Sequence, residues 1–345
     1  MLRNLLLMFA GAAACVVALE LVLRVMPTST YSDTGYYIDP LIITYRPHHR
    51  FRSSWGWDLH DAVNHEVNNL GFLSARDFVP DRQALAVIGD SFVDASMLPD
   101  TDRIGTQLQR LVAQRAVYAM GGPGSSLLDY AERLRYAAEH LQVEDFVVIV
   151  ERGDIKQAYC GSGNIHGPCL ERASGQPTTQ LRPPPSAAQR YLRHSALLQY
   201  LLGHLRFDPA QRFGRFLASL SARQPGHTGV SQEYSKAELE HVLDRFFARI
   251  ERYRHGRLVM VFDCDRNALE RGVAARDAAR ADAMAFARAH GAVVIDTEPT
   301  FRDYLAATGR YLEVSPLDGH WNRAATALVA RDIAAVFATP ALHTP

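Results

Sequence analysis

The chain contains very little lysine and has no excess of charge of either sign. Among its 345 residues only Lys156 and Lys236 are lysines, and arginine supplies the rest of the positive charge. Lys and Arg together number 37, as do Asp and Glu, so the formal net charge is zero. A chain without a basic excess lacks the electrostatic signature of nucleic-acid binding, and we expect no nucleic-acid partner.

Cysteine is also sparse, and no two of the four cysteines form a C-x-x-C pair. This spacing excludes a zinc ribbon and a thioredoxin-like site. The histidines have no recognised ligand spacing either, so we expect no metal and no cofactor. Cys160 and Cys169 flank a short polar, glycine-rich run at 161–168. In an oxidising compartment they could form a disulfide, and two unpaired thiols are the alternative.

The longest apolar run of the sequence lies close to its N-terminus, from Leu5 to Val25, interrupted by Glu20 and Arg24. Its length of roughly 21 residues matches the ~20 that a helix needs to cross a bilayer. Arg3 precedes the run and favours an N-terminus in the cytoplasm, with the remainder outside. We expect residues 1–26 to be an uncleaved membrane anchor. A cleavable signal peptide is the alternative.

Beyond the anchor, we expect an extended lead-in with short strands over 27–80 and a main domain over 81–340. The main domain alternates short apolar runs with helical stretches, which favours a parallel sheet covered on both faces. Residues 160–235 interrupt the alternation and are interpreted as an insertion or lid. The predicted strands are Ala84–Ile88, Ala116–Met120, Asp145–Val150, Arg257–Phe262 and Ala292–Ile295, and the predicted helices are Ile104–Gln114, Ser126–His140, Ser235–Arg254, Val273–His290 and Arg323–Phe337.

Three groups of residues follow predicted strands or precede the last helix. Gly89–Phe92 reads Gly-Asp-Ser-Phe, and Gly121–Gly124 reads Gly-Gly-Pro-Gly. Asp318–Asn322 reads Asp-Gly-His-Trp-Asn. Ligand sites of open parallel sheets lie outside the carboxyl ends of the strands, where these groups are expected to meet. A serine, a glycine turn with approachable amides, and an Asp-x-His pair are the parts of a serine nucleophile site.

In this order, the three groups resemble the SGNH/GDSL hydrolase superfamily, over roughly residues 65–338. The first block matches Gly89-Asp90-Ser91, the glycine block matches Gly122 or Gly124, and the last block matches Asp318 and His320. The resemblance implies that Ser91 is the nucleophile, His320 the general base and Asp318 the residue that orients it. It also implies a three-layer α/β/α flavodoxin-like fold and ester hydrolysis or acyl transfer.

Two further segments are similar to membrane-anchored bacterial members of the superfamily, namely Asn68–Phe72 and the apolar helix with Glu20 and Arg24. We therefore expect a single-pass protein of the bacterial inner membrane whose main domain is in the periplasm. The expected substrate is an acyl ester or a glycan.

The sequence departs from the family pattern at two places. Gly153 stands where the third block has the asparagine that donates to the oxyanion, followed by Asp154. The loss of one oxyanion donor costs on the order of 10²–10³ in turnover. The Asp-x-His spacing, shorter than the usual Asp-x-x-His, is similar to that of polysaccharide O-acetyltransferase relatives. The residues expected at the oxyanion or substrate-binding side are Asp90, Gly122, Gly124, Gly153 and Asp154, with Asn164 or Arg152 as other candidate donors.

The glycine at position 153 leaves a second hypothesis open, a weakly active or non-catalytic protein that binds glycans during assembly and keeps the fold. A metal-dependent phosphoesterase that uses Asp318 and His320 is a third, without any further ligand motif. Asp263-Cys264-Asp265 follows a predicted strand and is expected near the rim of the site.

Overall fold

The computed structural model describes residues 2–162, 166–205, 235–272, 277–316 and 318–338. The chain forms two compact units. One contains Met1–Ser32, Arg50–Asn64 and Pro184–Glu233, and the other contains Asp33–His49, His65–Pro183 and Tyr234–Pro345. Residues 27–80, which we expected to form one lead-in, are therefore divided between the two units.

The larger unit is built on a five-stranded sheet in the order β11-β10-β7-β5-β6. Every neighbouring pair in it is parallel, with Val87 of β5 opposite Ala119 of β6 and Val147 of β7. In chain order this is 2-1-3-4-5, the flavodoxin-like arrangement, as the resemblance implied. The strands are β5 (Leu85–Gly89), β6 (Val117–Gly121), β7 (Asp145–Val150), β10 (Leu258–Phe262) and β11 (Val293–Asp296).

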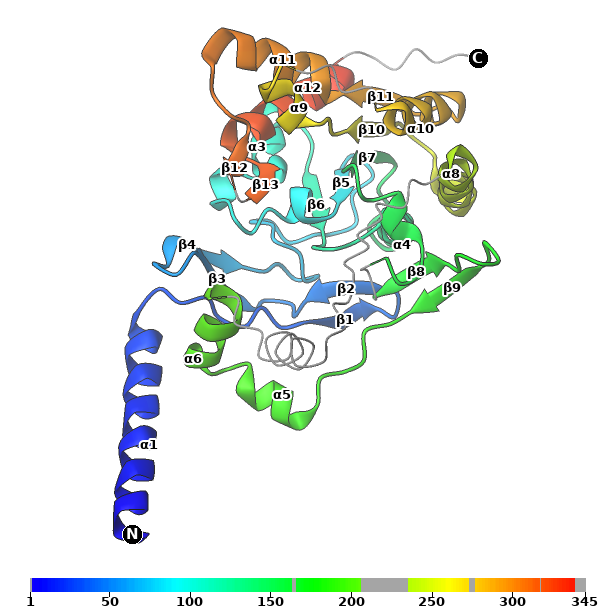
Figure 1. The fold of residues 1–345 in the computed structure, drawn as a ribbon. Coiled ribbons are helices and arrows are strands. Elements are labelled where there is room, and N and C mark those ends of the chain that lie inside the picture. Colours follow the sequence, from blue (N-terminus) through cyan, green and yellow to red (C-terminus); the bar gives the residue numbers. More distant parts are fainter. Residues whose placement is uncertain (1, 163–165, 206–234, 273–276, 317, 339–345) are drawn as a thin grey trace, which may run out of the picture. The chain divides into compact units, whose positions relative to one another are not determined.

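Helices cover both faces of this sheet and give three layers (Figure 1). Side chains alternate along a strand, so Ala86 and Ile88 of β5 pack on one face while Leu85 and Val87 pack on the other. The first face is covered by α4 (Leu127–Leu141), α8 (Lys236–Ile250) and α10 (Ala278–Ala289), and the second by α3 (Ile104–Leu111), α11 (Thr297–Thr308) and α12 (Arg323–Ala338).

Short elements complete the larger unit. Three antiparallel hairpins join β1 (Thr34–Asp39) to β2 (Ile42–Tyr45), β8 (Gly167–Leu170) to β9 (Pro177–Gln180), and β12 (Glu313–Ser315) to β13 (Asp318–Trp321). The short helices are α2 (Ser91–Asp94) and α9 (Arg266–Glu270), with 3₁₀ turns at Asp100–Asp102, Lys156–Ala158 and Glu251–Tyr253. A disulfide joins Cys160 to Cys169.

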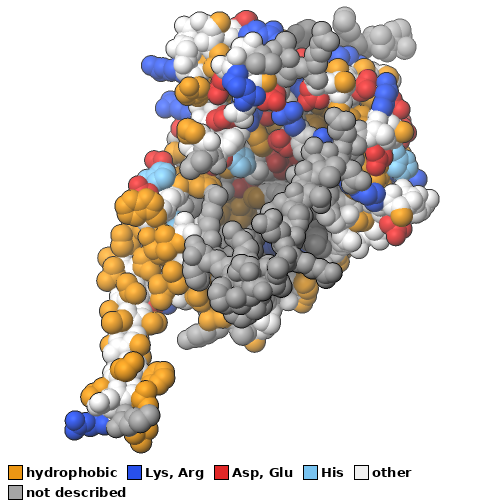
Figure 2. All heavy atoms as spheres, viewed as in Figure 1, with side chains coloured by type: hydrophobic (Ala, Val, Ile, Leu, Met, Phe, Trp, Pro, Cys, Tyr) orange, Lys and Arg blue, Asp and Glu red, His pale blue; other side chains and the backbone are white. Residues whose placement is uncertain are grey.

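The smaller unit contains the helix α1 (Leu2–Val25), the only described helix that is long and apolar enough to cross a membrane. Apolar side chains cover its surface (Figure 2), and Leu6, Met8 and Phe9 are each more than 60% exposed. No polar face accompanies them, as expected of a helix that meets lipid rather than water. The expected anchor is therefore a continuous helix, and length and composition alone suit a signal sequence equally well.

Near its C-terminal end, α1 contacts the segment that contains α6. Glu20 pairs with Arg24 at 2.7 Å, the i,i+4 contact expected from the sequence. Its carboxylate also accepts from Ser195 Oγ at 2.8 Å and from the Leu197 N–H at 2.9 Å. The unit also contains β3 (Arg50–Trp55), most of β4 (His60–Glu66), α5 (Ala187–Leu192), α6 (Ala196–Gln199) and a π-helical turn at Tyr200–His204.

Candidate active site

Ser91 lies at the switch point of the sheet, where the chain leaves β5 and the strand order reverses. Asp90 caps the short helix α2, since its Oδ1 accepts from the Phe92 N–H at 2.9 Å. This cap places Ser91 in the first turn of α2. A side chain at position 121 would lie 2.2 Å from the backbone nitrogen of Asp94, so glycine at the end of β6 lets α2 pack against that strand.

Asp318 and His320 lie two residues apart on β13, so their side chains point to the same face of the hairpin. The imidazole Nδ1 hydrogen-bonds the Asp318 carboxylate, and the His320 backbone N–H donates to Asp318 Oδ1 at 3.1 Å. Burial by itself lowers the pKa of His320, but the hydrogen bond and the charge of Asp318 outweigh it. The pKa is raised above its ordinary value.

The two halves of the site meet through the serine hydroxyl. His320 Nε2 lies 2.7 Å from Ser91 Oγ, although 229 residues separate them in the chain. Ser91 Oγ also lies 3.2 Å from Asp90 Oδ2. The Phe92 ring packs against the imidazole with 5.1 Å between the ring centres. A serine hydroxyl, an imidazole and a carboxylate in this hydrogen-bonded series have the geometry of a nucleophile, a general base and an orienting group.

On the oxyanion side, two of the expected amide donors are bonded within the protein. The Gly122 N–H donates to the carbonyls of Gly89 at 3.2 Å and Asp90 at 3.3 Å. The Gly153 N–H donates to Glu151 Oε2 at 2.6 Å. Neither amide is directed at a substrate in this conformation.

Two other amides remain available. Ser91 is the first residue of α2, so its N–H has no acceptor within the helix. Gly124 has a φ of +70°, and its carbonyl accepts from His166 Nε2. Among the described residues no acceptor lies against the N–H of either Ser91 or Gly124. An N–H group without an acceptor in the protein can donate to a negatively charged oxygen.

The two acidic residues expected at this side, Asp90 and Asp154, are both buried. Asp154 is fully buried, and its Oδ2 accepts from the Glu151 N–H at 2.6 Å. Burial raises the pKa of Asp154 well above its ordinary value, and burial raises that of Asp90 to about 6. Asn164 lies outside the described residues. Arg152 pairs with Asp265 at 3.1 Å and with Asp277 at 3.2 Å.

A polar cavity of about 270 Å³ adjoins His320. Asp263, Cys264 and Asp265 all line it, which is where the sequence pattern placed them. Burial raises the pKa of Cys264 to about 12, so this thiol stays protonated and is a poor nucleophile. The other lining residues are Phe92, Glu151, Arg152, Arg266, Asn267, Glu313, Gly319 and His320.

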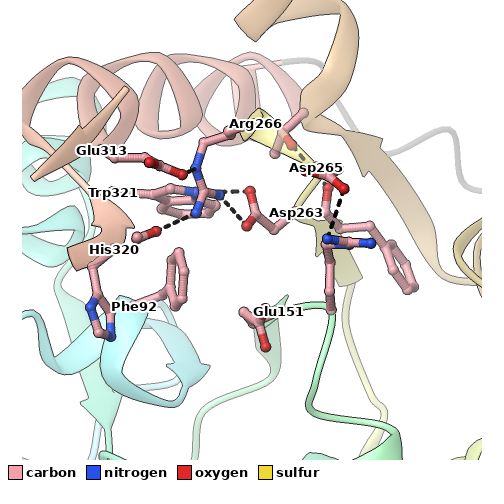
Figure 3. Close-up of polar contacts among 12 residues, drawn as sticks. Phe92, Glu151, Asp263, Asp265, Arg266, Glu313, His320 and Trp321 are labelled. Carbon is pink, nitrogen blue, oxygen red and sulfur yellow. Dashed lines mark hydrogen bonds and ion pairs between the residues drawn. The ribbon is translucent and has the colours of Figure 1, made fainter. Parts of the chain in front are cut away.

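Sequence reasoning missed a buried network beside the triad (Figure 3). Asp263 accepts from Trp321 Nε1 at 2.9 Å and pairs with Arg266, whose Nε lies 3.4 Å from Glu313 Oε1. Asp263 and Arg266 could have been found from the sequence, because they follow the carboxyl end of a predicted strand. No sequence signal indicated Glu313, because the short strand β12 has no apolar pattern.

No family model matches the chain, and no curated protein matches it. Solved structures that are similar include a lipolytic protein of the G-D-S-L family from Veillonella parvula DSM 2008, with 12% identity over 74% of this chain and 98% of that one and a TM-score of 0.41. LAE5, an α/β hydrolase enzyme from the metagenome of Lake Arreo in Spain, has 15% identity over 76% and 97%, with a TM-score of 0.41. A variant of Axe2, an acetyl-xylooligosaccharide esterase from Geobacillus, has 12% identity over 77% and 99%, with a TM-score of 0.40. At this level of similarity the side chains of the site must supply the evidence for an activity.

Proposed function

We propose that this chain is a serine esterase or O-acyltransferase in which Ser91 attacks the acyl carbonyl of an ester. The observation that carries the proposal is the hydrogen-bonded series from Ser91 Oγ through His320 to Asp318. Each contact in it joins the atoms that the chemistry requires, the hydroxyl to Nε2 and Nδ1 to the carboxylate.

In the proposed reaction, His320 takes the Ser91 proton as the hydroxyl oxygen bonds to the acyl carbon. The N–H groups of Ser91 and Gly124 donate to the oxyanion that forms. Imidazolium then gives the proton to the departing alcohol, which leaves an acyl-enzyme. Water or a sugar hydroxyl, deprotonated by His320, attacks the acyl carbon, and the imidazolium returns the proton to Ser91 Oγ as the ester bond to the serine breaks. Water gives hydrolysis and a sugar hydroxyl gives transfer.

The proposed location is the periplasmic side of the bacterial inner membrane, with a cell-envelope or secreted glycan ester as the substrate. Two features support an extracytoplasmic location. Helix α1 is long and apolar enough to be an anchor, and the Cys160–Cys169 disulfide suits an oxidising compartment. The polar lining of the cavity beside His320 suits a hydroxyl-rich alcohol better than an alkyl chain.

The test is the hydrolysis of p-nitrophenyl acetate by purified full-length protein in detergent. Ser91→Ala and His320→Ala should each lower kcat by about 10³-fold or more, because each removes a group that reacts in the transition state. Ser125→Ala is a matched control, since Ser125 is a buried serine of the neighbouring turn that bonds the Gly122 carbonyl. Wild-type turnover in the Ser91 or His320 variant would disprove the assignment.

The occupied amides of Gly122 and Gly153 favour a second candidate, a glycan-binding assembly protein with weak or no catalysis. A fluorophosphonate probe distinguishes the two functions, because it reacts only with an activated serine. Labelling of the wild type that Ser91→Ala abolishes supports the enzyme. A folded wild-type protein that binds acetylated oligosaccharide and stays unlabelled supports the binding protein.

A further inference from the structure

Arg266 is a buried arginine at the start of α9, directly after the loop that follows β10. Its side chain is only 7% exposed, and its guanidinium lies 5.5 Å from the centre of the Phe92 ring. It donates to the Asp263 carboxylate and to the Gly319 carbonyl, and its Nε faces Glu313 at 3.4 Å. A planar guanidinium that hydrogen-bonds two groups and pairs electrostatically with a carboxylate restrains the three relative to one another, and a lysine ammonium does so less well.

Two of those acceptors belong to the β12–β13 hairpin, which carries the acid and the base of the proposed triad. Glu313 is in β12, and Gly319 lies between Asp318 and His320 in β13. The hairpin is a separate two-stranded sheet whose register shifts between Glu313 and Ser315. Its own backbone pairing therefore constrains the Gly319 peptide poorly, and an isolated two-stranded sheet is only marginally stable.

A second contact ties the same hairpin to the same strand end. The Asp263 carboxylate, which accepts a hydrogen bond from Arg266, also accepts one from Trp321 Nε1 at 2.9 Å. The Phe92 ring, next to Ser91 in the chain, packs edge-on against Trp321 with 5.1 Å between ring centres. Arg266 therefore lies between the residues that hold the hairpin, close to Phe92 of α2 and to the β12–β13 hairpin itself (Figure 3).

We propose that Arg266 is a positioning residue for the triad, which fixes the peptide between Asp318 and His320 and thereby keeps Nε2 within reach of Ser91 Oγ. The inference rests on the proposed function. Arg266 acts through the Gly319 carbonyl and through Asp263. A displacement of about 1 Å of the base is enough to cost on the order of 10² in rate.

The charge of Arg266 gives a second readout. The charged groups that face His320 are Asp318 on its own strand, Asp90 before α2, and Arg266 in α9. The carboxylates favour the imidazolium, and the guanidinium opposes it. Removal of the guanidinium should therefore move the acid limb of the pH profile of kcat/KM to higher pH. Arg266→Lys keeps the positive charge and should leave the limb in place, so a loss of kcat in that variant reports on position rather than on charge.

The experiment compares Arg266→Met and Arg266→Lys with a matched control, Arg280→Met. Arg280 is 9% exposed and donates to the backbone carbonyls of Asp263 and Phe262, but among the described residues it pairs with the carboxylate of Asp296 and contacts neither the Asp263 carboxylate nor the hairpin. With p-nitrophenyl acetate, Arg266→Met should lower kcat about 10- to 100-fold with little change in KM, and the acid limb should move to higher pH. Arg266→Lys should lower kcat by less than Arg266→Met does. Arg280→Met should keep the wild-type kcat and pH profile.

A folded Arg266→Met protein with wild-type kcat and pH profile would overturn the inference, as would an equal loss in Arg280→Met. If Arg266→Met fails to fold, Arg266→Lys becomes the test, and an unchanged kcat in it overturns the inference. The proposed function is judged separately. It fails if Ser91→Ala retains activity, whereas the inference alone fails if Ser91→Ala is inactive and the Arg266 variants are normal.

Discussion

At the scale of single residues, the proposed nucleophile has two hydrogen-bond acceptors within reach. His320 Nε2 lies 2.7 Å from Ser91 Oγ and Asp90 Oδ2 lies 3.2 Å from it. The serine has one proton, so the shorter contact is the one we assign to the reaction. Burial raises the pKa of Asp90 to about 6, and the pKa of His320 is raised above its ordinary value.

The pH dependence of the reaction separates these two groups. The general base must be neutral, and Asp318 keeps the pKa of His320 above its ordinary value of 6.5 against the opposing effect of burial. We expect kcat/KM to rise with pH through an apparent pKa above 6.5. Asp318→Asn should move this limb to lower pH, since the charge that holds the proton is gone. It should also lower the plateau by about 10⁴-fold.

The control for this profile is Asp90→Asn, which removes the other buried carboxylate beside Ser91 and leaves the imidazole pair intact. It should shift the limb less than Asp318→Asn does. A limb that stays in place in Asp318→Asn and disappears in Asp90→Asn would show that Asp90, rather than His320, is the group that titrates.

At the scale of elements, the sheet was predictable and the hairpin that completes the site was not. Each sheet strand is a short apolar run buried on both faces, a pattern that is present in the sequence itself, as at Leu85–Gly89. The β12–β13 hairpin contains Asp, Gly and His, and its position depends on Arg266 and Asp263, more than 45 residues upstream. Contacts of that kind leave no periodic signal.

Besides the short helices α2 and α9, one longer helix of the larger unit, α11, was not predicted, although its boundaries carry signals. Thr297–Thr308 forms α11, which begins where Asp296 accepts from the Glu298 N–H and ends at Gly309 in the left-handed conformation. Pro299 lies in the first turn, where proline is tolerated because that N–H has no intrahelical acceptor. The predicted helix at Val273–His290 begins in residues outside the described set, and α10 covers Ala278–Ala289.

The loop closed by the Cys160–Cys169 disulfide contacts the oxyanion side through His166, whose Nε2 bonds the Gly124 carbonyl. A double substitution of both cysteines by alanine should lower the free energy of unfolding by about 2–3 kcal/mol, the loop-closure value for a bridge of nine-residue separation. It should also lower kcat more than it raises KM, because the Gly124 peptide loses a partner that orients it.

Urea unfolding and ester turnover, each measured with and without reductant, check this prediction. Cys15→Ala is the matched control, since Cys15 is an exposed free cysteine. A double variant as stable and as active as the wild type would show that the loop holds its shape without the covalent bond.

At the scale of the whole molecule, all residues of the proposed site belong to one unit, and α1 belongs to the other. The proposed topology puts the C-terminal end of the chain outside the cytoplasm. A C-terminal alkaline phosphatase fusion should therefore be active in a bacterial host and a C-terminal green fluorescent protein fusion exported by the same route should be dark. The reverse pattern would contradict the proposed location.

The separation of 229 residues between the nucleophile and its base has a consequence for biosynthesis. The chain is made from its N-terminus, so Ser91 is synthesised well before Asp318 and His320, and in the proposed topology it is also exported before them. Until the β12–β13 hairpin has docked beside α2, Ser91 has no imidazole partner, so in the proposed reaction a nascent or truncated chain forms no acyl-enzyme. The proposed activity thus arises only once residues 318–321 have been made and have folded against α2.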